Sequence, residues 1–114
     1  MQGIISALKE SKLFESIKVL ELIDEETIKL IKIKAPLKDG STLFITELHT
    51  SEYQKYSYHW QGLDGQMIVR WDNKPHWPKL KTFPHHKHEK DRISLSSRIT
   101  IQEVIETINA KLRF

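Results

Sequence analysis

The chain has 114 residues, a net charge of +3, and a globular composition with 39% hydrophobic and 29% charged residues. This length predicts a single domain over residues 1–114, and the absence of cysteine excludes disulfides, thiolate catalysis and cysteine-ligated zinc. No apolar run reaches the roughly 18 residues that a membrane span requires, and residues 1–12 lack a signal-peptide pattern. We therefore expect a cytoplasmic protein that does not associate with a membrane.

The first predicted element is a short helix around the apolar residues of 4–8. Two strands follow, over 17–23 and over 27–35, with a polar turn between them. In the second strand the apolar alternation slips by one residue between Leu30 and Ile31. A β-bulge at that point would explain the slip.

Three more strands are predicted over 42–49, 54–61 and 67–73. Two turns carry strong hairpin signals. Asp39-Gly40 precedes the first of these strands, and Gly62-Leu63-Asp64-Gly65 joins the second to the third. Consecutive hairpins favour antiparallel pairing of neighbouring strands.

The segment 74–91 contains Pro75, Pro78 and Pro84, and is predicted to be a long ordered loop because proline removes backbone donors. A short strand over 93–97 is expected after it. The chain then ends in an amphipathic helix, whose apolar face consists of Ile101, Val104, Ile105, Ile108 and Leu112. Thr100 and Glu103 fit a capping box at its start. The predicted fold is α+β: an antiparallel sheet of about five to six strands, with this helix on one face and a possible short N-terminal helix.

Positive charge is concentrated between Arg70 and Arg92. This window holds seven basic and three acidic residues, a net charge of +4, and four of the six histidines. Such a local concentration is expected where a protein meets an anion such as a phosphate. A solvated basic loop is the alternative interpretation.

The first candidate motif begins at Arg70. Strand alternation places Arg70 and Asp72 on the same face, where the carboxylate can pair with the guanidinium and orient it towards a phosphate. Asn73 follows directly and is a binding candidate. His76, further along the same motif, is a catalytic candidate. A structural ion pair, with Asn73 capping the turn, is the alternative.

The second candidate motif is the histidine cluster His85, His86 and His88. Because histidine titrates near neutral pH, two of these residues could supply an acid and a base. RNA cleavage needs little more, since the attacking 2′-hydroxyl belongs to the substrate. The cation that holds the phosphate could be Lys81, Lys87 or Arg70.

The histidines could instead bind a metal, with Asp72 or Glu47 completing the ligand set. Their spacing matches no established zinc motif such as His-Glu-x-x-His. We therefore expect no metal and no other cofactor, while an inert basic loop remains a further alternative.

The third candidate motif is the alternating aromatic strand. Tyr58 is a candidate for stacking on a nucleobase, whereas Tyr56 and Trp60 are predicted to lie in the core. His59 points to the opposite face and is retained as a binding candidate.

The runs Tyr56-Ser57-Tyr58-His59-Trp60, Arg70-Trp71-Asp72-Asn73-Lys74-Pro75-His76 and Phe83-Pro84-His85-His86-Lys87-His88 resemble the TumE-type toxins of prokaryotic toxin–antitoxin pairs. Trp71, Lys74 and Trp77 depart from the family pattern and leave the charged and histidine positions intact. The resemblance implies a growth-inhibiting protein neutralised by a partner, often a helix-turn-helix DNA-binding antitoxin. It implies no catalytic residue.

These observations lead to three functional hypotheses. The first is a toxin that acts on nucleic acid, with RNA favoured over DNA, as a small metal-independent ribonuclease. The second is a non-catalytic module that binds nucleic acid or protein. The third is a metal-dependent nuclease or nucleotidyltransferase.

Overall fold

The computed structural model of the protein describes residues 2–73, 85–89, 92–95 and 98–112. The elements run α1 (Gln2–Ser11), β1 (Lys18–Asp24), β2 (Ile28–Pro36), β3 (Thr42–Thr50), β4 (Gln54–Gln61), β5 (Met67–Asp72), β6 (His86–Glu89), β7 (Arg92–Leu95) and α2 (Ile101–Leu112). The strands form a seven-stranded sheet in which each pairs antiparallel with the next along the chain. The predicted α+β class, with an antiparallel sheet and a helix at each end of the chain, is confirmed.

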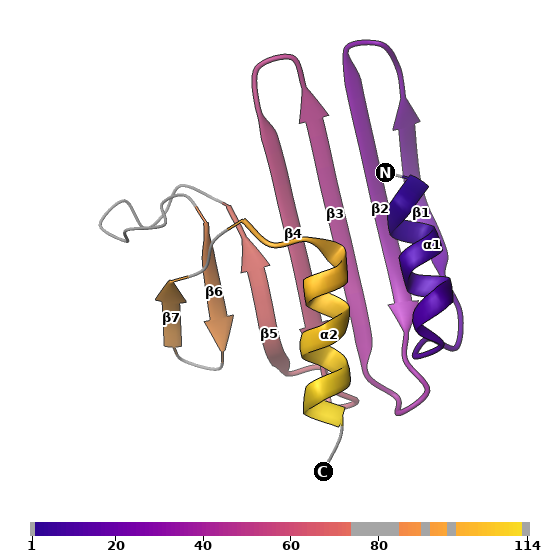
Figure 1. Ribbon diagram of the computed structural model, residues 1–114, viewed down its shortest axis with the longest axis vertical. Helices are drawn as coiled ribbons and strands as arrows, with labels where there is room; N and C mark the ends of the chain where they lie inside the picture. The colour runs from indigo at the N-terminus through magenta and orange to yellow at the C-terminus, as the bar shows by residue number, and fades with distance from the viewer. Residues whose placement is uncertain (1, 74–84, 90–91, 96–97, 113–114) are drawn as a thin grey trace.

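Both helices lie against the same face of the sheet (Figure 1). Beneath them, β4 buries its aromatic side chains Tyr56, Tyr58 and Trp60, as alternation along the strand requires. Val104 and Ile108 of α2 are fully buried in the same core. We call the opposite face, on which no described helix lies, the open face.

The start of α2 has the predicted cap. The hydroxyl of Thr100 accepts a hydrogen bond from the backbone N–H of Glu103 at 3.2 Å, and also contacts the Glu103 carboxylate at 3.1 Å. This satisfies one of the amide groups that a helix N-terminus leaves without an intrahelical partner. Ile99, directly before the cap, is buried and fixes the entry of the chain into the helix.

Replacing Ile105 by alanine should lower the free energy of unfolding by about 2–5 kcal/mol, the usual cost of truncating a buried aliphatic side chain. Ile105 is 5% exposed and packs in the core under α2. Urea unfolding of Ile105→Ala beside Glu106→Ala, which changes the adjacent exposed position, measures the difference. Equal stabilities of the two variants would contradict this packing.

The expected bulge between Leu30 and Ile31 is wrong. The register from Ile28 opposite Thr50 to Pro36 opposite Thr42 is unbroken. The register shifts of the described strands lie elsewhere, in β1 between Val19 and Glu21 and in β4 between Trp60 and Gln61. The alternation slips because β2 is apolar on both faces at its start. Ile31 is buried under the helices, while Leu30 lies on the open face.

The long loop expected over 74–91 is also wrong in its described part. His86–Glu89 forms β6, which pairs with β5 and with β7, so the sheet has seven strands where five to six were expected. The prolines that suggested a loop all precede residue 85. The rest of the expected loop, apart from His85, lies outside the described residues.

Candidate active site on the open face of the sheet

Four of the predicted site residues meet on the open face. In the antiparallel register of β5 and β6, Asp72 lies opposite His86 and Arg70 opposite His88. Directly opposed residues project to the same side of a sheet. The strand pairing therefore brings together side chains that are up to 18 positions apart in the sequence.

Asp72 is at the centre of this cluster. One carboxylate oxygen, Oδ2, accepts a hydrogen bond from Nε of Arg70 at 2.9 Å, and Oδ1 accepts one from Nε2 of His86 at 2.8 Å. Nε2 of His88 lies 3.6 Å from Oδ2 and 3.3 Å from Nη2 of Arg70. Because a guanidinium can only donate, Nε2 of His88 accepts in this contact.

Burial divides the cluster into an inner and an outer pair. Asp72 and His86 are 0% and 1% exposed, whereas the side chains of Arg70 and His88 are 31% and 15% exposed. Arg70 and His88 are thus the members that a ligand on the open face can touch. Asp72, which also contacts the buried His86, lies against both Arg70 and His88 and positions them.

A third residue extends the outer pair into a row across three strands. His59 of β4 lies directly opposite Arg70, so Arg70 has a histidine on each side along the open face. These three strands are neighbours in the sheet (Figure 1). Burial, and secondarily the charge of Arg70, lowers the pKa of His59 and favours its neutral form.

His85 and Lys87 lie on the other side of the sheet. Lys87 is opposite the buried Trp71, and its ammonium pairs with Glu89 at 3.1 Å, which lowers the pKa of that carboxyl. Nδ1 of His85 is 2.8 Å from the hydroxyl of Tyr56. The expected grouping of Lys87 with Arg70 is therefore not found, because successive residues of a strand point to opposite faces.

Tyr58 and Asn73, both predicted to bind a ligand, make structural contacts. Tyr58 is 2% exposed in the core and donates its hydroxyl proton to the buried carboxylate of Glu47, and burial strongly raises its pKa. Asn73 accepts from the backbone N–H of Tyr56 at 2.9 Å and donates to the carbonyl of Gln54 at 2.7 Å. It clamps the end of β5 to the start of β4. His76 and Lys81 lie outside the described residues.

The sequence pattern gave no reason to consider Arg98, which lies just before α2. Its guanidinium carbon is 5.2 Å from the centre of the Tyr56 ring, on the helix side of the sheet. Its charge contributes to lowering the pKa of His85, after the larger effect of burial. Burial nevertheless raises the pKa of Tyr56 to about 12, so this tyrosine stays protonated. Only the tertiary fold brings Arg98 to this position.

Asp72, His86 and His88 also form the metal-ligand geometry considered for the histidine motif. Their ligand atoms all lie within 4.8 Å of one another, and two imidazoles with a carboxylate suit zinc or a similar divalent ion. The guanidinium of Arg70 contacts both Asp72 and His88 in the same cluster. A bound cation would have to displace or tolerate that positive charge.

Comparison with known protein families decides the classification. The family described as Toxin TumE matches residues 4–114. The chain belongs to the TumE toxin family. Neither the curated proteins nor the solved structures give a match.

Family membership confirms the resemblance seen in the three motifs and makes the chain the toxin component of a toxin–antitoxin pair. It also implies an antitoxin partner for this TumE-family protein. Within the part of the chain that the structure describes, neither helix combines the length and apolar character needed to cross a bilayer.

Proposed function

We propose that this TumE-family toxin acts on RNA as a small, metal-independent ribonuclease. The observation that carries the proposal is the row His59, Arg70, His88 on the open face, with an arginine between two histidines. Cleavage of RNA through its own 2′-hydroxyl requires one base, one acid and a cation for the phosphate. The row supplies these three groups.

In the proposed reaction Arg70 holds the scissile phosphate with its planar guanidinium. His59 is the base, because its lowered pKa keeps it neutral, and it takes the proton from the 2′-hydroxyl. The O2′–P bond forms and the P–O5′ bond breaks. His88 gives a proton to the departing 5′-oxygen, leaving a 2′,3′-cyclic phosphate and a 5′-hydroxyl.

The backbone spacing fits this division of roles. Neighbouring strands are about 4.8 Å apart, so His59 and His88 are separated by about 10 Å at the backbone, with Arg70 between them. When a phosphate takes the Nη2 donor of Arg70, the Asp72 oxygen 3.6 Å from Nε2 of His88 becomes the acceptor for a protonated ring. Asp72 and His86 are positioning residues that do not touch the substrate.

The biological setting follows from the family and the chemistry. A substrate-borne nucleophile favours RNA over DNA, and we propose a cytoplasmic site of action where RNA is accessible. The partner is a protein antitoxin, and a helix-turn-helix DNA-binding protein is the type that we propose.

The ligand geometry of Asp72, His86 and His88 favours one other candidate, a metal-dependent nuclease or nucleotidyltransferase. In that case the three residues would hold a divalent ion that polarises a phosphoryl oxygen or activates a nucleophile. The contacts of Arg70 with Asp72 and His88 weigh against it.

Exhaustive chelation separates the two candidates. Dialysis against EDTA should leave RNA cleavage unchanged, whereas a 2′-deoxy substitution at the scissile nucleotide should abolish it, because the internal nucleophile is removed. Cleavage rates are measured on matched oligonucleotides by gel or mass spectrometry. Loss of activity with EDTA and its return with zinc or manganese would establish the metal enzyme. Binding without any turnover would establish the non-catalytic module.

A further inference from the structure

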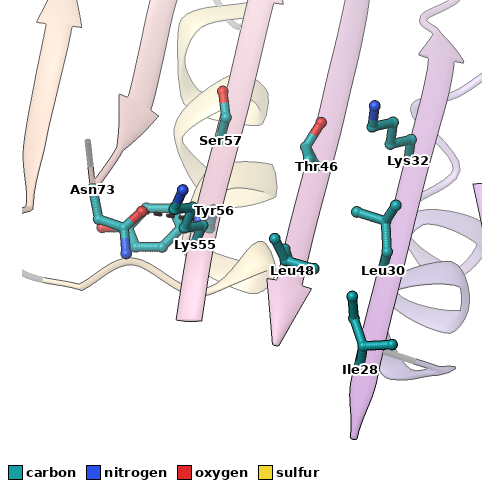
Figure 2. Close-up of a pocket in the computed structure, with 9 residues that line it drawn as sticks. All are labelled: Ile28, Leu30, Lys32, Thr46, Leu48, Lys55, Tyr56, Ser57 and Asn73. Atoms are coloured by element: carbon teal, nitrogen blue, oxygen red, sulfur yellow. Dashed lines mark hydrogen bonds between the residues drawn. The ribbon is translucent and has the colours of Figure 1, made fainter. Parts of the chain in front are cut away.

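The open face has a second feature, a groove of about 390 Å³ at the end of the sheet where β2 begins and β3 ends. Its apolar lining includes Ile28, Leu30 and Leu48. Figure 2 shows these side chains in front of the sheet, with the helices behind it. The groove is therefore separate from the core that the helices cover.

The apolar part of the groove spans two strands. Leu30 and Leu48 are directly opposite each other in the register of β2 and β3, and Ile28 is next on the same face of β2. All three side chains are only partly buried. A solvated sheet face normally alternates to polar residues, and a contiguous apolar patch on such a face marks a site of interaction.

Among the residues that the structure describes, the groove lining has two charged side chains, and both are positive. Lys32 lies on β2 and Lys55 on β4, with Leu48 of β3 between them and Leu30 beside Lys32 on the same strand (Figure 2). Lys32 is 3.5 Å from the exposed Glu21, and the ammonium of Lys55 lies over the ring of Tyr53 at 5.1 Å. An occupant that matches this surface presents apolar side chains to the centre and carboxylates to the two lysines.

We propose that this groove docks an acidic amphipathic segment of the antitoxin. The inference rests on the toxin–antitoxin pairing and not on the identity of the reaction. The segment places its apolar side chains against Leu30 and Leu48 and pairs its carboxylates with Lys32 and Lys55.

The groove adjoins the candidate active site. Ser57 and Asn73 both line it, Ser57 lies directly opposite Asp72 in the sheet, and Asn73 follows Asp72 in the chain. A chain segment that leaves the groove along the open face at this point meets the cluster of Asp72 and Arg70. Docking therefore brings the antitoxin to where it can cover the phosphate-binding surface.

The test measures the affinity of the antitoxin encoded in the same pair, purified separately, for variants of the full chain by biolayer interferometry. The double variant Leu30→Gln, Leu48→Gln should bind about tenfold more weakly or worse, as expected for the centre of an interface. Lys32→Glu with Lys55→Glu should also weaken binding, and the wild-type affinity should fall with salt. The matched controls are Leu63→Gln and Lys38→Glu, both exposed at the opposite end of the sheet, and these should bind like wild type.

Methyl NMR on the wild-type chain keeps the test decisive if a variant fails to fold. The methyl signals of Ile28, Leu30 and Leu48 should shift on addition of antitoxin, and that of Leu63 should not. RNA cleavage is assayed in parallel. If the chain binds antitoxin through the groove but cleaves no RNA, the ribonuclease proposal fails and the docking proposal stands. Unchanged affinity with unmoved methyls would overturn docking. Methyl shifts caused by an RNA oligonucleotide or by self-association, but not by antitoxin, would assign the groove to that ligand instead.

Discussion

His88→Ala should lower RNA cleavage, and toxicity on expression, by about a hundred-fold or more, the usual scale for removing a general acid. His88 is the outer histidine of the cluster, 3.3 Å from Arg70 and 3.6 Å from Asp72. Its side chain is 15% exposed, so truncation also removes buried contacts, and stability has to be measured beside activity. Cleavage assays and melting curves on the same preparation measure both properties.

The control is His49→Ala. This residue is a half-buried histidine of β3 that contacts Glu47 at 3.3 Å, in a register position on the helix side of the sheet. It should retain activity. A folded His88→Ala variant with full activity would remove His88 from the mechanism, whereas a parallel loss of melting temperature and activity would give it a structural role.

The pH profile of RNA cleavage by the wild-type protein tests His59, the proposed base that works with His88. A base must be neutral, and the pKa of His59 is lowered, so the rate should hold until the pH falls below the ordinary histidine value of about 6.5. The rate then declines as His59 becomes protonated. At higher pH the rate should fall again, because the proposed acid, His88, loses its proton. In His59→Ala the decline at low pH should disappear from the residual rate.

The sequence was sufficient to predict one side of the site. Alternation along β5 correctly placed Arg70 and Asp72 on a common face, and alternation along β4 placed His59 away from the core aromatics. Alternation within one strand does not predict which other strand pairs with it. The pairing of β6 with β5 depends on the tertiary fold. The row of His59, Arg70 and His88 follows from the register of three strands.

The histidine cluster shows why treating 85–88 as a loop misled the assignment of roles. Once His86–Glu89 is a strand, His86 and His88 share a face, while His85 and Lys87 take the other. The loop was predicted from Pro75, Pro78 and Pro84, and histidine and lysine have no strong preference for strands that would have opposed it. Pairing with β5 makes this segment a strand, and it places Lys87 on the opposite face from Arg70.

The apolar slip in β2 was a correct observation with the wrong explanation. A bulge and a two-faced apolar strand give the same sequence pattern. The continuous register through Leu30 and Ile31 decides between them, and the open-face residue of the pair becomes part of the groove. The slip was thus the sequence signal of the apolar groove on the open face.

Asp72→Asn should destabilise the protein by about 3–5 kcal/mol, the cost of removing one partner from a buried ion pair. The carboxylate of Asp72 is 0% exposed and lies 2.9 Å from Nε of Arg70 and 2.8 Å from Nε2 of His86. Asparagine keeps the shape but replaces an acceptor oxygen and the negative charge with an amide, which must then face a donor. The loss is a substantial fraction of the roughly 5–15 kcal/mol by which domains are stable.

The measurement is urea unfolding of Asp72→Asn, His86→Gln and the double variant. Because the two side chains share a direct hydrogen bond, the double variant should lose less stability than the sum of the single variants, with a coupling of about 0.5–3 kcal/mol. Arg70→Gln provides the comparison, since its side chain is 31% exposed and solvent screening makes its loss less costly. If Asp72→Asn is as stable as wild type, the carboxylate does not hold the cluster together, and its effect on His88 and Arg70 would have to come from the field of its charge alone.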